Sequence, residues 1–180
     1  MIYEGELKGR FVKLRSITLD DAQFSFDIRA DEKNRETVGV VASSLEDQIK
    51  FIEWQMKQPN DYYFVVLNRK DEKIGLIGVY DICGETGEMG REVNYGSCVE
   101  VIEAQVLLQD FAMDVLGLKK LSFVIYANNP KQLKNQQRNK VFPIKKTIRN
   151  GVECYYYEFE LTKDNSVRRK LARVGDDFLD

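Results

Sequence analysis

Residues 88–96, EMGREVNYG, residues 102–118, IEAQVLLQDFAMDVLGL, and residues 121–127, LSFVIYA, decide the fold of this chain. The outer segments favour strands, and the middle one predicts a helix whose apolar residues cover most of its circumference. Three acidic residues leave only a narrow polar stripe on that helix: Glu103, Asp110 and Asp114. We therefore expect the helix to lie against a sheet and under other structure. The order strand, helix, strand implies a right-handed crossover and a parallel strand pair.

The segments around this crossover predict an otherwise antiparallel sheet. Residues 62–68 and 73–82 alternate as strands and form a meander with 88–96. Six further segments complete the expected fold: a strand over 9–17, helices over 20–30 and 43–57, a polar helix begun near Pro130, and the two strands of a hairpin, 141–149 and 152–162, around Asn150 and Gly151. The fold class is α/β (α+β), a single domain over 1–163 with a mixed, mostly antiparallel seven-stranded sheet and helices on both faces. Residues 164–180 form a charged tail that we expect to be helical.

The composition narrows the chemistry. The 180 residues include no histidine, which excludes Ser-His and Cys-His nucleophile pairs and His-ligated metal. Cys83, Cys98 and Cys154 are widely spaced, so we expect reduced thiols and no metal site. With 27 basic and 29 acidic residues the chain has no overall field for nucleic acid. The N-terminus lacks a signal-peptide pattern and no apolar run could span a bilayer, so we expect a cytoplasmic protein with no membrane partner.

Several local strings, in their order and spacing, resemble one enzyme superfamily. They are VKLRSITLDDA (12–22), SLEDQIKFIE (44–53), DYYFVV (61–66), KIGLIGVYDI (73–82), GEMGREV (87–93), EAQVLLQDFAMDVLGLKKL (103–121) and NNP (128–130). Over roughly residues 8–142 the chain is similar to the GNAT superfamily of acyl-CoA-dependent N-acetyltransferases. It most resembles the branch of amino-sugar-nucleotide and ribosomal-protein N-terminal acetyltransferases.

This resemblance implies a binding site for acetyl-CoA as co-substrate. In the superfamily the fourth strand, here 88–95, separates from the fifth, here 121–126, and the pantetheine arm pairs with the exposed edge of the fourth. The cofactor-binding residues would be Val93, Asn94, Tyr95, Gly96, Ser97, Asn128, Asn129 and Lys134. The diphosphate loop departs from the family pattern, because Ser97 and Glu100 have the spacing of a capping box that uses the same N–H groups. This loop is therefore a degenerate version of the family's.

The same resemblance implies the reacting side chains. Glu88 matches a glutamate near the acceptor amine that can act as a base, and strand alternation would put Glu92 on the same face to share that role. The alternative for Glu88 is an exposed carboxylate at a strand end. Arg29 and Tyr80 would contact substrate, although a solvated Arg29 is the simpler interpretation. Gln136 stands near the position where a tyrosine commonly reprotonates the CoA thiolate.

The sequence thus predicts an N-acetyltransferase that moves acetyl from acetyl-CoA to a primary amine, a small molecule, with an amino-sugar nucleotide as the favoured acceptor. Two alternatives stay open. One is acetylation of a protein N-terminal amine, and the other is a GNAT-shaped binding or assembly module without transfer activity. Exposed strands and the tail helix also permit a homodimer.

Overall fold

The computed structural model describes residues 1–35 and 39–174. Eight strands form one sheet: β1 (Glu6–Lys8), β2 (Val12–Ser16), β3 (Tyr62–Asn68), β4 (Lys73–Cys83), β5 (Thr86–Asn94), β6 (Lys120–Tyr126), β7 (Lys145–Arg149) and β8 (Val152–Glu160). The helices are the 3-10 turn η1 (Leu19–Asp21), α1 (Ala22–Ala30), α2 (Glu32–Arg35), α3 (Leu45–Lys57), α4 (Cys98–Asp114), α5 (Pro130–Arg138) and α6 (Ser166–Ala172). No helix among the described residues is long and apolar enough to cross a membrane.

The expected mixed, mostly antiparallel sheet is confirmed, with the strand order β1-β2-β3-β4-β5-β6-β8-β7. Among the strands of the described residues, the one parallel pair is β5 with β6, connected through α4 as the crossover predicts. The sheet has one strand more than the seven expected. The additional strand, β1, has only three residues, ELK, which is too short for side-chain alternation to be read from the sequence.

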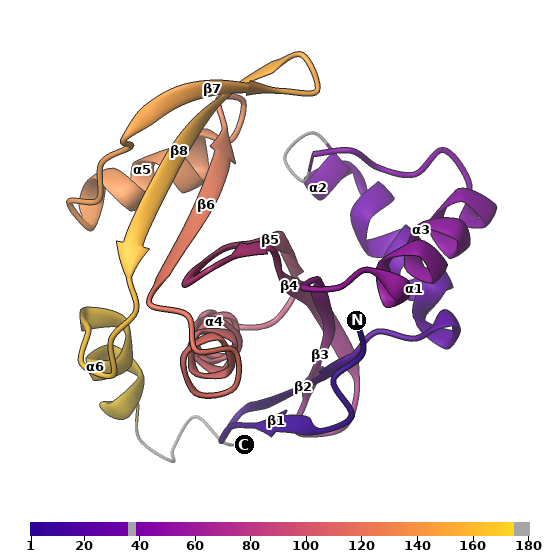
Figure 1. Cartoon of the computed structure of the whole chain (residues 1–180), viewed down its shortest axis with the longest axis horizontal. Helices are drawn as coiled ribbons and strands as arrows, with labels where there is room; N and C mark the ends of the chain where they lie inside the picture. Colours follow the sequence, from indigo (N-terminus) through magenta and orange to yellow (C-terminus); the bar gives the residue numbers. More distant parts are fainter. Residues whose placement is uncertain (36–38, 175–180) are drawn as a thin grey trace.

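The two halves of the sheet separate beside their parallel pair. β5 pairs with β6 only at Thr86–Lys120, Gly87–Leu121 and Glu88–Ser122. Beyond these pairs β5 continues to Asn94, while β6 continues to Tyr126 and pairs along its length with β8 instead. We call this divergence, between residues 89–94 and 123–126, the strand split. Figure 1 shows β6 and β8 running away from β5, so that the C-terminal half of the sheet leans away from the N-terminal half.

Hydrophobic packing covers both faces of the N-terminal half of the sheet. On one face α4 packs through Ala104, Leu108 and Phe111 against residues of β2, β3 and β4. On the other face α1 and α3 pack through Ile28 and Ile52 against a second set of buried strand residues. Figure 1 shows α4 and the pair α1 and α3 on opposite sides of β2–β5. One face of β5 therefore lies toward the α4 cluster, and the other lies toward the cluster of α1 and α3.

The sequence predicts that the acidic stripe of α4 faces solvent, but one of its residues, Glu103, is buried. Glu103 is 4% exposed and accepts hydrogen bonds from the backbone N–H groups of Arg10 (2.8 Å), Phe11 (2.6 Å) and Val12 (2.8 Å). Its carboxylate therefore provides the hydrogen-bond acceptors for the backbone N–H groups of the turn between β1 and β2, more than ninety residues away in the sequence.

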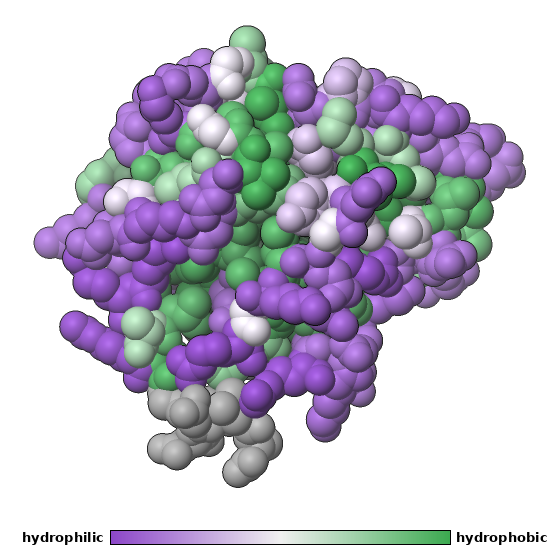
Figure 2. Space-filling model, turned by 60° about the horizontal axis from the view of Figure 1, so that its bottom comes forward, coloured by the Kyte–Doolittle hydropathy of each residue, from purple (hydrophilic) through white to green (hydrophobic). Residues whose placement is uncertain are grey.

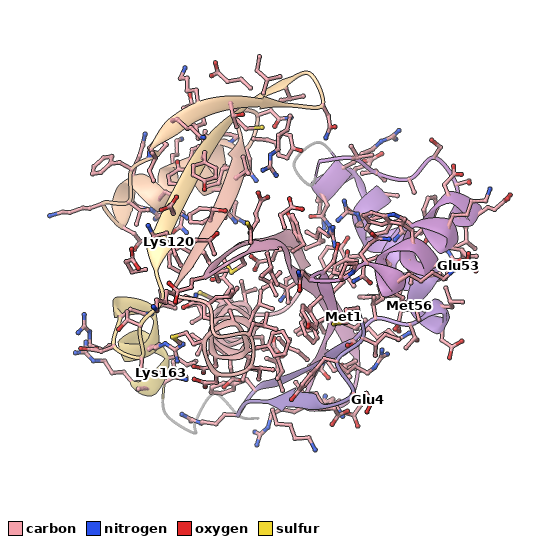
Figure 3. The ribbon with its side chains drawn as sticks, in the orientation of Figure 1. Met1, Glu4, Glu53, Met56, Lys120 and Lys163 are labelled. Atoms are coloured by element: carbon pink, nitrogen blue, oxygen red, sulfur yellow. The ribbon has the colours of Figure 1, made fainter. Side chains whose placement is uncertain are left out.

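The other end of that stripe anchors the C-terminal segment. Lys163 lies on the side of α4 that faces α6 (Figure 3) and pairs with Asp110 (2.6 Å) and Asp114 (2.6 Å). Arg168 of α6 also pairs with Asp110 (2.9 Å), and Leu171 packs against the α4 cluster. Figure 2 shows this side of the molecule, where a band of hydrophobic residues runs between hydrophilic margins.

Candidate active site

A β-bulge lies in the part of β5 that forms the strand split. Gly78 lies opposite Gly90 and Leu76 opposite Val93, so both Arg91 and Glu92 lie opposite Ile77. Arg91 takes a left-handed conformation with φ of 53°, which allows the extra residue to be accommodated. A bulge shifts the alternation of side chains by one position, so residues on either side of it change faces.

Glu88 lies before the bulge and is buried, which contradicts the alternative of an exposed strand-end carboxylate. Its side chain is 8% exposed and accepts two hydrogen bonds from the guanidinium of Arg149, each 2.5 Å long. The hydroxyl of Tyr80 donates a third hydrogen bond of 2.9 Å. Burial and the neighbouring Glu88 carboxylate raise the pKa of Tyr80 well above its usual range, so the hydroxyl stays protonated as a donor.

Arg149 joins the two sides of the strand split. It is the last residue of β7, 61 residues from Glu88 in sequence, and the turn that follows it is the predicted hairpin at Asn150 and Gly151. Sequence reasoning missed Arg149, because an arginine beside a hairpin turn has no pattern that names its partner. The pairing fixes the hairpin relative to the base of the strand split.

A second ion pair continues this network on the same face. Arg91 donates to Asp61 from both terminal nitrogens (2.6 and 2.8 Å), and its guanidinium stacks 4.1 Å from the centre of the Tyr80 ring. Gln55 of α3 also donates to Asp61, at the Oδ1 atom that Arg91 binds (3.0 Å). A chain of contacts thus runs from Asp61 through Arg91, Tyr80 and Glu88 to Arg149, on the face of the sheet that carries α1 and α3. Its charged groups alternate in sign, and the neutral Tyr80 lies between Arg91 and Glu88.

Glu92 lies on the opposite face, so the expectation that it shares the face of Glu88 was wrong. The bulge turns its side chain toward α4, where the amide of Gln105 donates to both carboxylate oxygens (2.9 and 3.0 Å). Desolvation raises the pKa of Glu92 to about 7, against the smaller lowering effect of Gln105. Glu88 and Glu92 therefore flank the strand split from its two faces.

This pKa predicts a pH-dependent stability. Between the ordinary value of 4.5 and about 7 the folded protein binds more protons at Glu92 than the unfolded chain does, so stability falls as the pH rises. We expect Glu92→Gln, which resembles the protonated form, to match the wild type at pH 5 and to be about 1–2 kcal/mol more stable at pH 8, allowing for partial solvent access. Urea unfolding at the two pH values measures the difference. Glu53→Gln, on the exposed side of α3 (Figure 3), is the matched control and should show no such change.

The predicted capping box begins α4. Ser97 accepts from the N–H of Glu100 (3.5 Å), and the Glu100 carboxylate accepts from the N–H (2.7 Å) and hydroxyl (2.8 Å) of Ser97. Just before it, the side chain of Asn94 accepts from the N–H of Gly96 (2.7 Å). The N-terminus of α4 thus uses its own side chains to satisfy part of its backbone.

The remaining sequence-predicted residues fall into separate groups. Arg29 is buried and donates to the carbonyl of Val40 (2.8 Å), so it is not a solvated side chain. The hydroxyl of Tyr95 accepts from Asn34 (3.1 Å), and Asn129 caps α5 by accepting from the N–H of Gln132 (3.1 Å). Val93 packs in the core beside α3. Lys134 lines a surface hollow on α5 of about 530 Å³ with Lys131, Gln137 and Arg138.

The arrangement favours acid–base chemistry by carboxylates. Glu88 and Glu92 are the carboxylates at the strand split, and the chain contains no histidine. All three cysteines are free thiols, with Cys83 and Cys98 exposed and Cys154 buried. Within residues 1–35 and 39–174 no cluster of three or more cysteine or acidic side chains could hold a metal ion.

Comparison with known proteins identifies the family. The family model for the acetyltransferase (GNAT) domain matches residues 12–139. A search of curated proteins gave no match.

Solved structures share the fold at low sequence identity. A GCN5-related N-acetyltransferase from Brucella melitensis has a TM-score of 0.75 at 13% identity, covering 94% of this chain and 85% of its own. FdhC, a nucleotide-linked sugar GNAT, has a TM-score of 0.73 at 19% identity, and the match covers 93% of this chain and 94% of FdhC. A Vibrio cholerae protein described as a candidate ribosomal-protein-serine acetyltransferase has a TM-score of 0.71 at 17% identity. That match covers 89% of this chain and 99% of the Vibrio cholerae chain. The domain match, extending through the strand split and the helices on either side of it, shows that this chain belongs to the GNAT acetyltransferase family, enzymes that transfer an acyl group from acyl-CoA to an amine.

Proposed function

We propose that this protein transfers acetyl from acetyl-CoA to the primary amine of an amino-sugar nucleotide. The observation that carries the proposal is the strand split, since β5 and β6 stop pairing after Glu88 and Ser122 and leave an edge for an extended arm. An ammonium is not a nucleophile, so a proton must leave the acceptor before or during its attack on the thioester. The buried carboxylate of Glu88, at the base of the strand split, is the group that we propose to receive it.

The edge of β5 suits a pantetheine arm. The N–H of Tyr95 donates to the carbonyl of Ile74 in β4 (2.8 Å), so in an antiparallel pair the backbone groups of the preceding Asn94 point away from β4. Those groups face the side on which β6 has already diverged, and an amide-bearing arm could pair with them as an added strand does. The side chain of Val93 is in the core, and by the same alternation its backbone groups face Leu76 of β4, so Val93 would support the arm only by holding β5 in place.

The diphosphate would lie near the start of α4, where the free N–H groups of the helix attract phosphate and the carboxylate of Glu100 repels it. Glu100 places a carboxylate beside the first turn of α4 and uses the N–H of Ser97. The cations that could offset it lie on α5, where Lys131, Lys134 and Arg138 line one hollow. We propose that these side chains, rather than a glycine-rich loop, provide most of the attraction for the phosphates.

Removing the charge of Glu100 should therefore strengthen cofactor binding. Glutamine at this position can still accept from Ser97 in a capping box, so Glu100→Gln changes charge more than helix geometry. Two charges about 6 Å apart repel by about 3 kcal/mol at an effective dielectric of 20, and solvent screening at this exposed site lowers this to about 1 kcal/mol. We expect acetyl-CoA to bind about five- to tenfold more tightly by calorimetry. An unchanged Kd would place the diphosphate away from Glu100.

The acceptor would approach the face of the sheet that carries α1 and α3. On this side a hollow of about 580 Å³ is lined by Phe26, Ala30 and Arg35 of α1 and α2 together with residues 39 and 41–43. An aromatic ring and a guanidinium suit a nucleoside diphosphate, one by stacking and the other by pairing with phosphate. The similarity of the fold to that of FdhC, a nucleotide-linked sugar GNAT, also supports this substrate class.

A substrate screen tests the proposal. Nucleotide-linked amino sugars and short peptides with free N-terminal amines are incubated with acetyl-CoA, and release of free thiol is followed. Turnover of the sugars alone supports the proposal, whereas turnover of peptides alone favours the protein N-terminal acceptor suggested by the Vibrio cholerae neighbour. Absence of acetyl-CoA binding in calorimetry would overturn both and favour a binding module.

A further inference from the structure

We propose that Glu92 protonates the sulfur of the departing CoA thiolate, as a second acid–base group of the strand split. This inference rests on the proposed function. It assigns Glu92 a role opposite to that of Glu88, with the two carboxyl groups acting from opposite faces of the sheet.

The first reason is the position of Glu92 along β5. If the diphosphate lies at the start of α4 and the arm pairs with Asn94, the arm runs back along β5 toward Glu88, and its thioester end comes to the bulge at Arg91 and Glu92. Glu92 lies beyond the last residue paired with β6, so among the described residues no strand pairs with this part of β5 on the side away from β4.

The second reason is the direction of the side chain. The bulge turns Arg91 toward Tyr80 and Asp61, on the face of Glu88, and turns Glu92 toward Gln105 of α4. The amine nitrogen and the leaving sulfur are bonded to the same carbon of the tetrahedral intermediate and point away from it in different directions. A base on one face and an acid on the other can therefore act in one addition and elimination sequence.

The third reason is the surroundings of the carboxyl group. Gln105 donates its amide to both oxygens, and this amide cannot take up a proton from Glu92. The charged groups nearby on α4 are directed elsewhere: Glu103 binds the turn at Arg10–Val12, and Glu100 binds Ser97. On β5 itself, Arg91 and Glu88 are on the other face. Desolvation is thus the main effect on Glu92, and it raises the pKa to about 7, which keeps a carboxylic acid available near neutral pH.

The step balances as follows. The amine nitrogen forms a bond to the thioester carbon, and its proton passes to Glu88 or water. The C–S bond then breaks, its electron pair goes to sulfur, and the proton of the Glu92 carboxyl group passes to that sulfur. Glu92 is left as a carboxylate and regains a proton from water. This role compensates for Gln136, which cannot supply a proton where the resemblance implied a tyrosine.

The test uses free CoA, whose thiolate absorbs in the ultraviolet, bound to the full chain. A carboxylate beside the sulfur disfavours the thiolate, so the bound thiol should titrate about one pH unit or more higher in the wild type than in Glu92→Gln. Glu85→Gln is the matched control, because Glu85 pairs with Lys119 ahead of β5 and is 61% exposed. It should titrate like the wild type.

With the acceptor found in the screen, we expect the wild-type rate to decline above pH 7 as Glu92 loses its proton. Glu92→Gln should lower kcat about 10- to 100-fold at pH 7 and remove that decline. CoA binding with the same thiol titration in wild type and Glu92→Gln would overturn this inference while leaving the proposed function in place. Failure of CoA to bind the wild type would overturn both.

Discussion

Replacing Glu88 by glutamine is expected to lower kcat by about 10²- to 10⁴-fold, the usual contribution of a positioned acid–base group. Glutamine keeps the shape of the side chain and can still accept from the hydroxyl of Tyr80, but it cannot take a proton from the acceptor amine. The measurement is steady-state thiol release with the acceptor identified in the screen, over a range of pH. Thermal melting of each variant shows whether the fold is retained.

Arg149→Gln separates the proton-accepting role of Glu88 from its role in the ion pair. This variant breaks the same bidentate contact from the side of β7 and leaves the Glu88 carboxylate in place. If Glu88 acts as the base, Arg149→Gln should lower kcat by no more than about tenfold, which is far less than the decrease expected for Glu88→Gln. Equal losses in the two variants would mean that only the ion pair matters, and wild-type kcat in Glu88→Gln would remove Glu88 from the chemistry.

The largest effect on stability is expected at Glu103. Glu103→Gln replaces a carboxylate that accepts three backbone N–H groups by an amide with one acceptor oxygen, and its NH₂ group would face the same donors. We expect a loss of about 2–4 kcal/mol in the free energy of unfolding, because hydrogen bonds to a buried charge are the strong ones and the N–H groups left unpaired are buried. Urea unfolding and the melting temperature measure the loss.

Glu46→Gln is the control for this prediction. Glu46 is in the first turn of α3, its side chain is 76% exposed, and it pairs with Lys50 on the same helix (2.7 Å). An exposed pair of this kind contributes about 0.3–0.5 kcal/mol, so this variant should differ little from the wild type. If Glu103→Gln were as stable as Glu46→Gln, the turn between β1 and β2 would not depend on the carboxylate.

Most elements were predictable because their signals are local. The period of two over 62–68 and 73–82 gave β3 and β4, and the apolar helix over 102–118 with strands on both sides gave the crossover and the parallel pair. The capping box at Ser97 and Glu100 was also found from its spacing. Each signal lies within a few residues, where backbone geometry fixes which side chains meet.

The side-chain contacts of the candidate site could not be predicted in this way, because they depend on residues far apart in the sequence. The left-handed Arg91 has no sequence signature of its own, yet its bulge moved Glu92 to the face of α4 and gave it Gln105 as partner. The burial of Glu103 depends on a turn ninety residues away.

Apart from β1 and α2, the sequence by itself determined the order of the main strands and helices and the crossover, and it indicated the family. Only the tertiary structure decided which face each glutamate of β5 occupies and that Arg149 holds Glu88. The physical reason is that periodicity records whether a position is buried, since burial of apolar area drives folding. The partner of a buried charge is set by the packing of distant segments, which no short stretch of sequence contains.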